Sequence, residues 1–188
     1  MKIAIEGMDG VGKTTIAKAI EKDLNYIYVK DPLKDLFEID NSHLIKVSDK
    51  IFNSNDDKLI SWYLALGDNY VLSEYKDKNI VMDRHILLNY FWNGNERTEN
   101  IFKTQIDMFG KPDLTIILYA SPEVRMKRIF KRNSNDPDLQ KTNMRQYGYD
   151  KMEEFMKRYN YNYVIVNTEN KTIKDIIDTC KRIINENK

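Results

Sequence analysis

Short apolar runs bounded by turn residues alternate along the chain with longer segments of helical periodicity. The runs are rich in β-branched residues, which favour strands. They occupy Lys2–Glu6, Tyr26–Val29, Asn79–Asp83, Leu114–Tyr119 and Tyr163–Val166. Cores such as Ile3-Ala4-Ile5 are continuously apolar rather than alternating, as expected of strands that are covered on both faces. We therefore predict five buried strands.

The segments around these strands repeat their apolar residues at helical spacing. They are Lys13–Leu24, Asp57–Tyr75, Glu99–Phe109, Pro122–Lys131, Met144–Arg158 and Thr172–Asn187. In the last of them, one apolar stripe contains Ile173, Ile176, Ile177, Cys180, Ile183 and Ile184. Because Cys180 belongs to that stripe, we expect it to pack in the core rather than to react.

Strands that alternate with helices are typical of α/β proteins with a parallel sheet. We predict a three-layer α/β sandwich, in which helices cover both faces of a five-stranded parallel sheet. Functional residues should then lie at the carboxyl ends of the strands. The 188 residues contain no internal repeat and no Pro/Gly/Ser-rich linker, so we expect a single domain over residues 1–188.

Charge and composition exclude several classes of function. The chain has 30 Lys and Arg against 29 Asp and Glu, so no global basic field favours nucleic acid or anionic lipid. No stretch approaches the roughly 20 apolar residues of a membrane helix, and the first apolar run is too short for a secretory signal. The single cysteine cannot form an internal disulfide. We expect a cytoplasmic protein that binds neither nucleic acid nor membrane.

The first predicted strand leads directly into a glycine-rich turn. Residues 7–14 read GMDGVGKT, which matches the phosphate-binding pattern GxxxxGK[ST], and a predicted helix follows. The residues expected to bind the phosphates of a nucleoside triphosphate are Gly7, Gly10, Val11, Gly12, Lys13, Thr14 and Thr15. Lys13 is expected to reach the β- and γ-phosphates, and the Thr14 hydroxyl is a suitable ligand for Mg²⁺.

A second polar cluster follows the third predicted strand. Asp83, at the strand tip, is expected to hold Mg²⁺ directly or through water, and Arg84 can bind phosphate oxygens in a bidentate manner. A GTPase is disfavoured because Asn170-Lys171-Thr172-Ile173 lacks the Asp of the guanine-reading pattern NKxD. We therefore assign Lys13, Asp83 and Arg84 to the chemistry of phosphoryl transfer.

These motifs together resemble the thymidylate kinase family, within the P-loop nucleoside and nucleotide kinases. The resembling segments are IEGMDGVGKTT at 5–15, KDP at 30–32, DRH at 83–85 and KPDLTIILYASPEVRMKRIFKR at 111–132. The resemblance implies a P-loop NTP hydrolase-like fold with a mobile lid at about residues 132–146. It also implies that the γ-phosphoryl group of ATP is transferred to dTMP, giving dTDP, with Mg²⁺ as cofactor.

The resemblance further implies roles for residues that bind the acceptor nucleotide. Asp9 corresponds to the residue that faces the 3′-hydroxyl of the sugar, and Lys30 to a basic residue near the acceptor phosphate. Arg84 corresponds to the arginine that bridges the acceptor and donor phosphates. Asn89 corresponds to a position near the base of the acceptor nucleotide. Asn69 stands where the family usually has an arginine that binds dTMP, so the chain lacks a cation there.

On the donor side, the resemblance places Arg128 against adenine and Arg132 at the start of the lid. Position 10 is glycine, so no arginine projects from the phosphate loop itself. Because the transferred phosphoryl group carries charge on its equatorial oxygens, a further cation is expected from the lid. The candidates are Lys131, Arg132, Lys141 and Arg145. We favour Arg132 as the catalytic one.

Three functions remain open. A monophosphate has a second pKa of about 6, so it is already a nucleophile at neutral pH and needs cations rather than a base. A nucleoside 5′-hydroxyl needs a carboxylate, and Asp31 stands before Pro32 where nucleoside kinases carry such an acid. We favour dTMP, with a deoxynucleoside kinase and a non-catalytic ATP sensor as alternatives. By resemblance we also expect a homodimer, with the helix Asp57–Tyr75 as a candidate interface.

Overall fold

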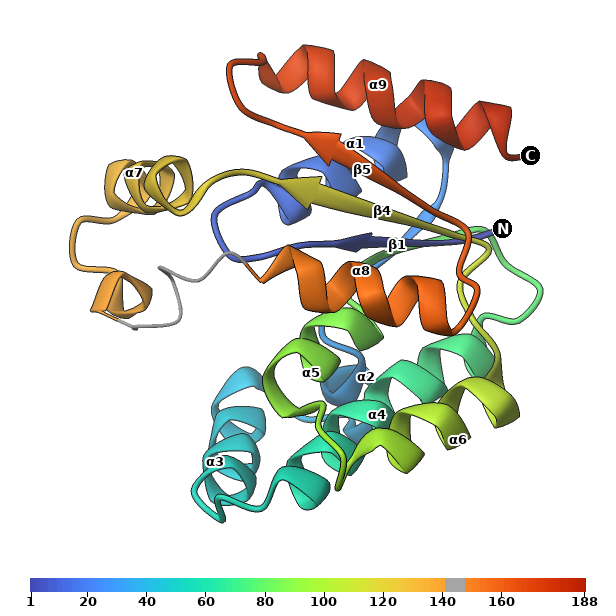
Figure 1. The fold of residues 1–188 in the computed structure, drawn as a ribbon, viewed down its shortest axis with the longest axis vertical. Helices are drawn as coiled ribbons and strands as arrows, with labels where there is room; N and C mark the ends of the chain where they lie inside the picture. The colour runs from blue at the N-terminus through green and yellow to red at the C-terminus, as the bar shows by residue number, and fades with distance from the viewer. Residues whose placement is uncertain (141–147) are drawn as a thin grey trace.

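The computed structural model describes residues 1–140 and 148–188, in which helices surround a central sheet (Figure 1). The strands are β1 (Lys2–Glu6), β2 (Ile27–Val29), β3 (Ile80–Asp83), β4 (Leu114–Tyr119) and β5 (Tyr163–Asn167). All neighbouring pairs are parallel, in the order β2-β3-β1-β4-β5. This confirms the predicted five-stranded parallel α/β sheet, and no strand boundary differs from the prediction by more than one residue.

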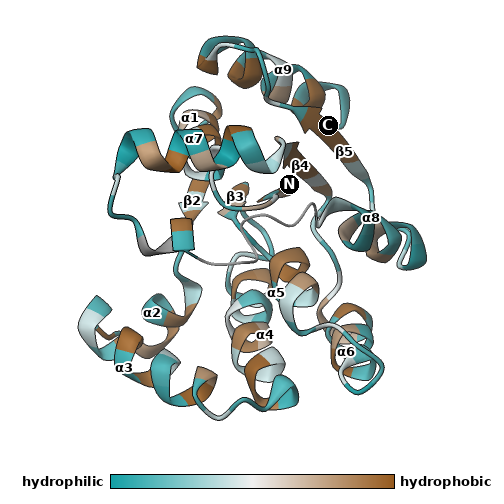
Figure 2. Ribbon diagram, turned by 60° about the vertical axis from the view of Figure 1, so that its left-hand side comes forward, coloured by the Kyte–Doolittle hydropathy of each residue, from teal (hydrophilic) through white to brown (hydrophobic). Residues whose placement is uncertain are grey.

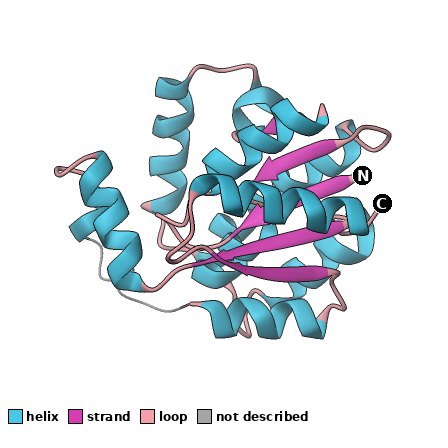
Figure 3. Cartoon of the chain, turned by 90° about the horizontal axis from the view of Figure 1, so that it is seen from above, coloured by secondary structure: helices cyan, strands magenta, loops and turns pink. Residues whose placement is uncertain are grey.

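Helices cover both faces of this sheet (Figure 3). They are α1 (Lys13–Leu24), α2 (Pro32–Phe37), α3 (Asn41–Phe52), α4 (Asp57–Glu74), α5 (Ile86–Asn93), α6 (Glu99–Phe109), α7 (Pro122–Arg132), α8 (Tyr149–Arg158) and α9 (Ile173–Glu186), with a 3₁₀ turn η1 (Pro137–Gln140). One core cluster joins α1 and α9 to the sheet, and a second joins α5, α6 and α8 to it. The buried apolar residues of α1, α5, α6, α8 and α9 therefore pack towards the sheet, and the hydropathy colouring shows brown segments interspersed with teal along these helices (Figure 2).

Three helices were not predicted from the sequence. Six of the eight residues of α5 are buried and most of the helix is apolar, so it shows no one-sided stripe. The helix α3 has no buried residue, and α2 is only six residues long. The predicted helix over 144–158 begins at Tyr149 in the described part of the chain, and residues 144–147 lie outside it.

The expectation for Cys180 is confirmed. Its side chain is fully buried between α9 and the sheet, and burial raises the pKa of its thiol to about 12. The thiolate form that would react is therefore disfavoured. In the part of the chain that the structure describes, no helix has the length and apolar character needed to span a bilayer.

Candidate active site

The glycine-rich turn follows β1 and ends where α1 begins. Gly7, Gly10 and Gly12 all have positive φ angles, of 128°, 85° and 103°. A Cβ atom on Gly7 would lie 2.3 Å from the carbonyl oxygen of Leu118, and one on Gly10 would lie 2.8 Å from that of Arg125. Only glycine fits at these two positions. The turn is therefore packed tightly against β4 and α7, with the positive end of the α1 dipole behind it.

Lys13 lies inside this turn. Its ammonium group donates to the carbonyl oxygens of Gly7 (2.8 Å) and Met8 (3.0 Å) and forms an ion pair with Asp9 at 3.5 Å. Burial and, to a smaller extent, the neighbouring Arg84 cation lower the pKa of Lys13 to about 8, while the surrounding carboxylates oppose the shift. The structure thus holds a desolvated cation at the centre of the phosphate-binding turn.

Asp83 meets the turn because β3 lies beside β1, with Ile5 paired to Asp83 in the sheet register. The Thr14 hydroxyl donates to Oδ2 of Asp83 at 2.5 Å, and the Tyr28 hydroxyl donates to the same atom at 3.1 Å. The other oxygen, Oδ1, is buried and accepts no hydrogen bond from any residue in 1–140 or 148–188. A hydroxyl and a carboxylate oxygen that still has bonding capacity are suitable ligands for Mg²⁺.

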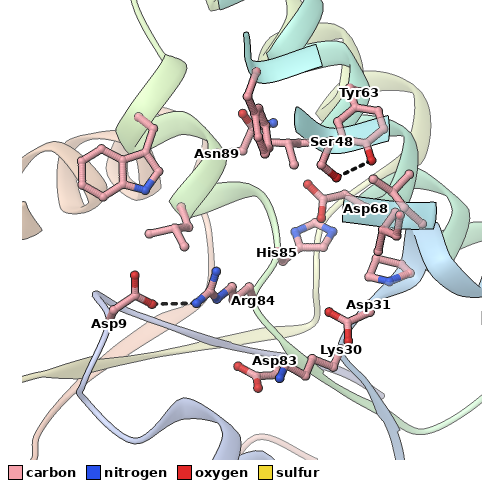
Figure 4. Close-up of a pocket in the computed structure, with 17 residues that line it drawn as sticks. Asp9, Lys30, Asp31, Ser48, Tyr63, Asp68, Asp83, Arg84, His85 and Asn89 are labelled. Atoms are coloured by element: carbon pink, nitrogen blue, oxygen red, sulfur yellow. Dashed lines mark hydrogen bonds and ion pairs between the residues drawn. The ribbon is translucent and has the colours of Figure 1, made fainter. Parts of the chain in front are cut away.

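Arg84 adopts a backbone conformation that is rare for a residue with a side chain. Its φ is +87°, held by a hydrogen bond from its N–H to the carbonyl oxygen of Ile5 at 3.1 Å. Backbone strain of this kind clusters at functional sites. The guanidinium Nη2 donates to Oδ1 of Asp9 at 2.6 Å, so the side chain points back towards the phosphate-binding turn (Figure 4).

Two cavities meet at the ion pair between Arg84 and Asp9. A cavity of about 450 Å³ lies over the turn and α1 and contains Gly10, Val11, Gly12, Lys13, Thr14 and Thr15 in its lining. A second cavity, of about 530 Å³, opens beyond the ends of β2 and β3 (Figure 4). Asp9 and Arg84 line both. We call them the donor cavity and the acceptor cavity, respectively.

The structure brings most of the predicted acceptor residues together. Lys30, Asp31 and Asn89 line the acceptor cavity, whereas Asn69 does not. Asn69 is buried within α4, at 7% exposure, and its neighbour Asp68 lines the cavity instead. Consecutive residues on a helix point about 100° apart, and in this part of α4 it is Asp68 that faces the cavity. The amide of Asn89 donates to the carbonyl oxygen of Ser61 at 3.1 Å, which fixes its orientation.

Part of the acceptor cavity wall comes from α3, which the sequence analysis did not detect. Leu44, Ser48 and Phe52 line the cavity and lie one helical turn apart. Ser48 Oγ is 2.8 Å from the hydroxyl of Tyr63 on α4, which connects the two helices (Figure 4). With Trp92 on α5, these residues give the cavity three aromatic side chains. The spacing of four residues in α3 was the available signal.

On the donor side, Arg128 and Arg132 both line the cavity from α7. Arg128 donates to the hydroxyl and to the carbonyl oxygen of Thr168, at 2.9 and 2.7 Å, which holds its guanidinium beside the end of β5. Arg132 forms an ion pair with Asp136 at 2.6 Å. Lys131 is exposed and is not part of either lining. The other candidate lid cations, Lys141 and Arg145, lie outside the described residues.

A buried polar cluster that the sequence analysis did not assign borders the acceptor cavity, which two of its members, His85 and Asp68, line. Glu6 accepts from the backbone N–H groups of His85 (2.9 Å) and Leu87 (3.0 Å), which links β1 to the start of α5. Burial raises the pKa of Glu6 to about 7 and lowers that of His85 to about 4. Burial also raises the pKa of Asp68 well above its usual value. An acid directly before the glycine-rich turn was the only sequence signal.

The thymidylate kinase family model matches residues 5–179. Among curated relatives, a probable thymidylate kinase of Methanococcus aeolicus is 28% identical and covers 93% of this chain and 90% of the relative. Another relative, probable thymidylate kinase 1 of Saccharolobus solfataricus, is 28% identical, and the match covers 98% of this chain and 97% of the relative. A solved structure of deoxyadenosine kinase from M. mycoides shares the fold, with a TM-score of 0.70 at 24% identity, covering 99% of this chain and all of that one. The glycine-rich turn and the Asp83-Arg84 pair lie within the matched region, so the chain belongs to the thymidylate kinase family and is a phosphotransferase.

Proposed function

We propose that this protein transfers the γ-phosphoryl group of ATP to dTMP, giving dTDP and ADP. The observation that carries the proposal is the meeting of the donor and acceptor cavities at the Asp9–Arg84 ion pair. Phosphoryl transfer needs the two phosphates in line and charge compensation between them, rather than covalent help. Arg84 lies at the junction of the two cavities, which is where that compensation is needed.

Different residues bind the phosphate donor and the acceptor nucleotide. On the donor side, Lys13 binds the β- and γ-phosphates, Thr14 and Asp83 hold Mg²⁺, and Arg128 lies against the adenine. When bound, Mg²⁺ neutralises charge on the β- and γ-phosphate oxygens. No general base is required, because the acceptor phosphate is dianionic at neutral pH. Arg132, at the end of α7, supplies a further cation.

On the acceptor side, we assign the 3′-hydroxyl to Asp9, the phosphate to Lys30 and Arg84, and the base to the region of Asn89. The aromatic wall supports this assignment, because Phe52, Tyr63 and Trp92 offer faces for a flat pyrimidine. Asn69 has no direct contact in this assignment, since it does not line the cavity. The arginine that the family usually has at that position is therefore not replaced by a direct contact from Asn69.

We further propose that the protein is a homodimer that acts in the cytoplasm. Leu59, Trp62 and Leu66 are exposed on α4 and lie three and four residues apart, so they form one apolar stripe. A second copy that packs on this stripe would remove it from water. Trp62→Glu should therefore give monomers in analytical ultracentrifugation, and a dimeric variant would exclude the stripe as the interface. The cytoplasm fits the reduced, buried Cys180.

A transfer assay with γ-labelled ATP and Mg²⁺ tests the reaction over a panel of deoxynucleoside monophosphates. We expect label in dTDP, with dTMP the preferred acceptor. Lys13→Ala should reduce kcat strongly while the circular dichroism spectrum stays that of a folded protein. Transfer to no acceptor at all would favour an ATP-binding sensor. Preference for a purine monophosphate would reject the assigned acceptor.

A further inference from the structure

Two side-chain amides form a hydrogen-bonded chain that ends at the wall of the acceptor cavity. Asn89 lines the cavity (Figure 4), and its Nδ2 donates to the backbone carbonyl oxygen of Ser61 on α4 at 3.1 Å. Asn93 lies one helical turn further along α5 and does not line the cavity. Its Nδ2 donates to Oδ1 of Asn89 at 3.0 Å and to the backbone carbonyl oxygen of Asn89 at 3.3 Å. The chain therefore runs from Asn93 through Asn89 to Ser61.

Backbone carbonyl groups fix the direction of this chain. A carbonyl oxygen only accepts hydrogen bonds, so both Asn89 and Asn93 must point their NH₂ groups at the backbone carbonyl groups that they contact. The backbone carbonyl oxygen of Asn93 in turn accepts from the Thr98 hydroxyl at 2.6 Å. Reversing the Asn89 amide would bring two oxygens together at Ser61 and two NH₂ groups together at Asn93. The Asn89 amide is therefore held in one orientation.

Part of the Asn89 amide is available to a bound molecule. A primary amide has two N–H bonds and two oxygen lone pairs. Among residues 1–140 and 148–188, Ser61 accepts one N–H of Asn89 and Asn93 donates to one lone pair. The second N–H and the second lone pair can bond to a molecule in the acceptor cavity. Because the orientation is fixed, the positions of this donor and this acceptor are fixed as well.

A fixed donor and acceptor distinguish two classes of pyrimidine. Thymine and uracil present an N–H donor at position 3 beside a carbonyl oxygen at position 4. Cytosine presents an acceptor nitrogen at position 3 beside an amino group at position 4. An amide can pair with both positions of either base, but the two pairings need opposite orientations of the amide. An amide that is held in one orientation can therefore pair fully with only one class.

We propose that Asn93 is a positioning residue that sets which pyrimidine monophosphate the enzyme prefers, by holding the Asn89 amide in the orientation that pairs with thymine and uracil. The proposal rests on the proposed function, because it takes dTMP as the acceptor and places its base near Asn89. Asn93 itself makes no contact with the acceptor in this assignment. A residue outside the cavity lining thus decides between a carbonyl oxygen and an amino group at position 4 of the base.

The matched acceptors for the test are dUMP and dCMP, which differ only at positions 3 and 4 of the base. Initial rates with γ-labelled ATP give kcat/KM for each acceptor. We expect the unaltered protein to prefer dUMP by about 5- to 150-fold, the discrimination of one bidentate amide–base pair. This measurement needs no variant, so it tests the orientation of Asn89 even if a substitution prevents folding.

Asn93→Asp tests the role of Asn93 directly. The introduced carboxylate repels Oδ1 of Asn89 and accepts from its NH₂ group in a charge-assisted hydrogen bond, which favours the reversed amide. The ratio of kcat/KM for dUMP to that for dCMP should fall by about 5-fold or more, while the KM for ATP stays unchanged. Asn93→Leu only removes the donor and should lower the ratio less, because Ser61 still holds one end of the Asn89 amide.

Asn100→Asp is the matched control, since it makes the same change at an exposed position on α6 outside both cavity linings. It should leave the ratio unchanged. Equal use of dUMP and dCMP by the unaltered protein would overturn the proposal. A proportional loss of both activities in Asn93→Asp would also overturn it, because a merely structural role has that effect.

Failure of the proposed function gives a different result. Transfer to no monophosphate at all would reject both the proposed function and the role of Asn93. A preference of the unaltered protein for dCMP that Asn93→Asp reverses would reject dTMP as the acceptor, but it would support Asn93 as the residue that sets the choice.

Discussion

Glu6 and His85 provide a test of the buried cluster in which the two residues have opposite effects. The pKa of Glu6 rises from 4.5 to about 7 because its carboxyl group is buried. The folded protein therefore holds a proton on Glu6 between about pH 4.5 and 7 that the unfolded chain has lost, so stability falls as the pH rises through that window. A pKa shift of this size corresponds to a change of about 3 kcal/mol in the free energy of unfolding. Replacing Glu6 by Gln removes this loss.

His85 acts in the other direction. Burial lowers its pKa from 6.5 to about 4, so between these values the unfolded chain binds the extra proton and stability rises with pH. The gain is again about 3 kcal/mol. The two contributions oppose each other over about pH 4.5 to 6.5, and the raised pKa of Asp68 adds to the decline from Glu6. Differences between variants and the unaltered protein isolate each residue.

Urea unfolding at pH values from 4 to 7 measures these differences. Relative to the unaltered protein, Glu6→Gln should gain about 3 kcal/mol in the free energy of unfolding from pH 4.5 to 7. His85→Gln should lose about 3 kcal/mol from pH 4 to 6.5. Glu21→Gln, at an exposed position on α1, is the control. Variants whose pH profiles run parallel to that of the unaltered protein would refute the reasoning, because neither group would then titrate differently on folding.

Three further predictions concern the phosphate-binding residues. Arg84→Lys keeps the charge but loses the planar guanidinium, and should lower kcat with dTMP by about 10²-fold or more in the transfer assay. Asp83→Asn should raise the Mg²⁺ concentration for half-maximal activity by about 10-fold, measured by magnesium titration, because a charged ligand is lost. Gly10→Ala should lower the melting temperature by several degrees, since the added Cβ would lie 2.8 Å from the carbonyl oxygen of Arg125 and φ is +85°. Unchanged values in these measurements would contradict the roles assigned.

The donor side of the site could be predicted because its signals are local. The glycine pattern lies between a strand and a helix that the apolar periodicity identifies independently. Asp83 and Arg84 follow a continuous apolar run, and the parallel sheet then brings them to the same edge as the glycine-rich turn. Sequence order and strand parallelism were enough to bring these residues together.

Parts of the acceptor cavity could not be predicted, because they depend on how the helices pack in the folded chain. Whether Asp68 or Asn69 faces the cavity is decided by the rotation of α4 about its axis, which its packing against α5 and α6 sets. The wall from α3 was missed because that helix buries none of its residues, so the spacing of Leu44, Ser48 and Phe52 was a weak signal. The perturbed pKa values of Glu6 and His85 arise from burial, and burial exists only in the folded chain.

The position of Asp9 explains how two cations can remain close together at the junction of the cavities. Arg84 lowers the pKa of Lys13, so each cation disfavours the charge of the other. Asp9 forms ion pairs with both, at 3.5 Å to Lys13 and 2.6 Å to Arg84, and opposes that repulsion. Phosphate oxygens at the same place would act on the two cations in the same way. The site is therefore organised for negative charge before any phosphate binds, which reduces the rearrangement needed during phosphoryl transfer.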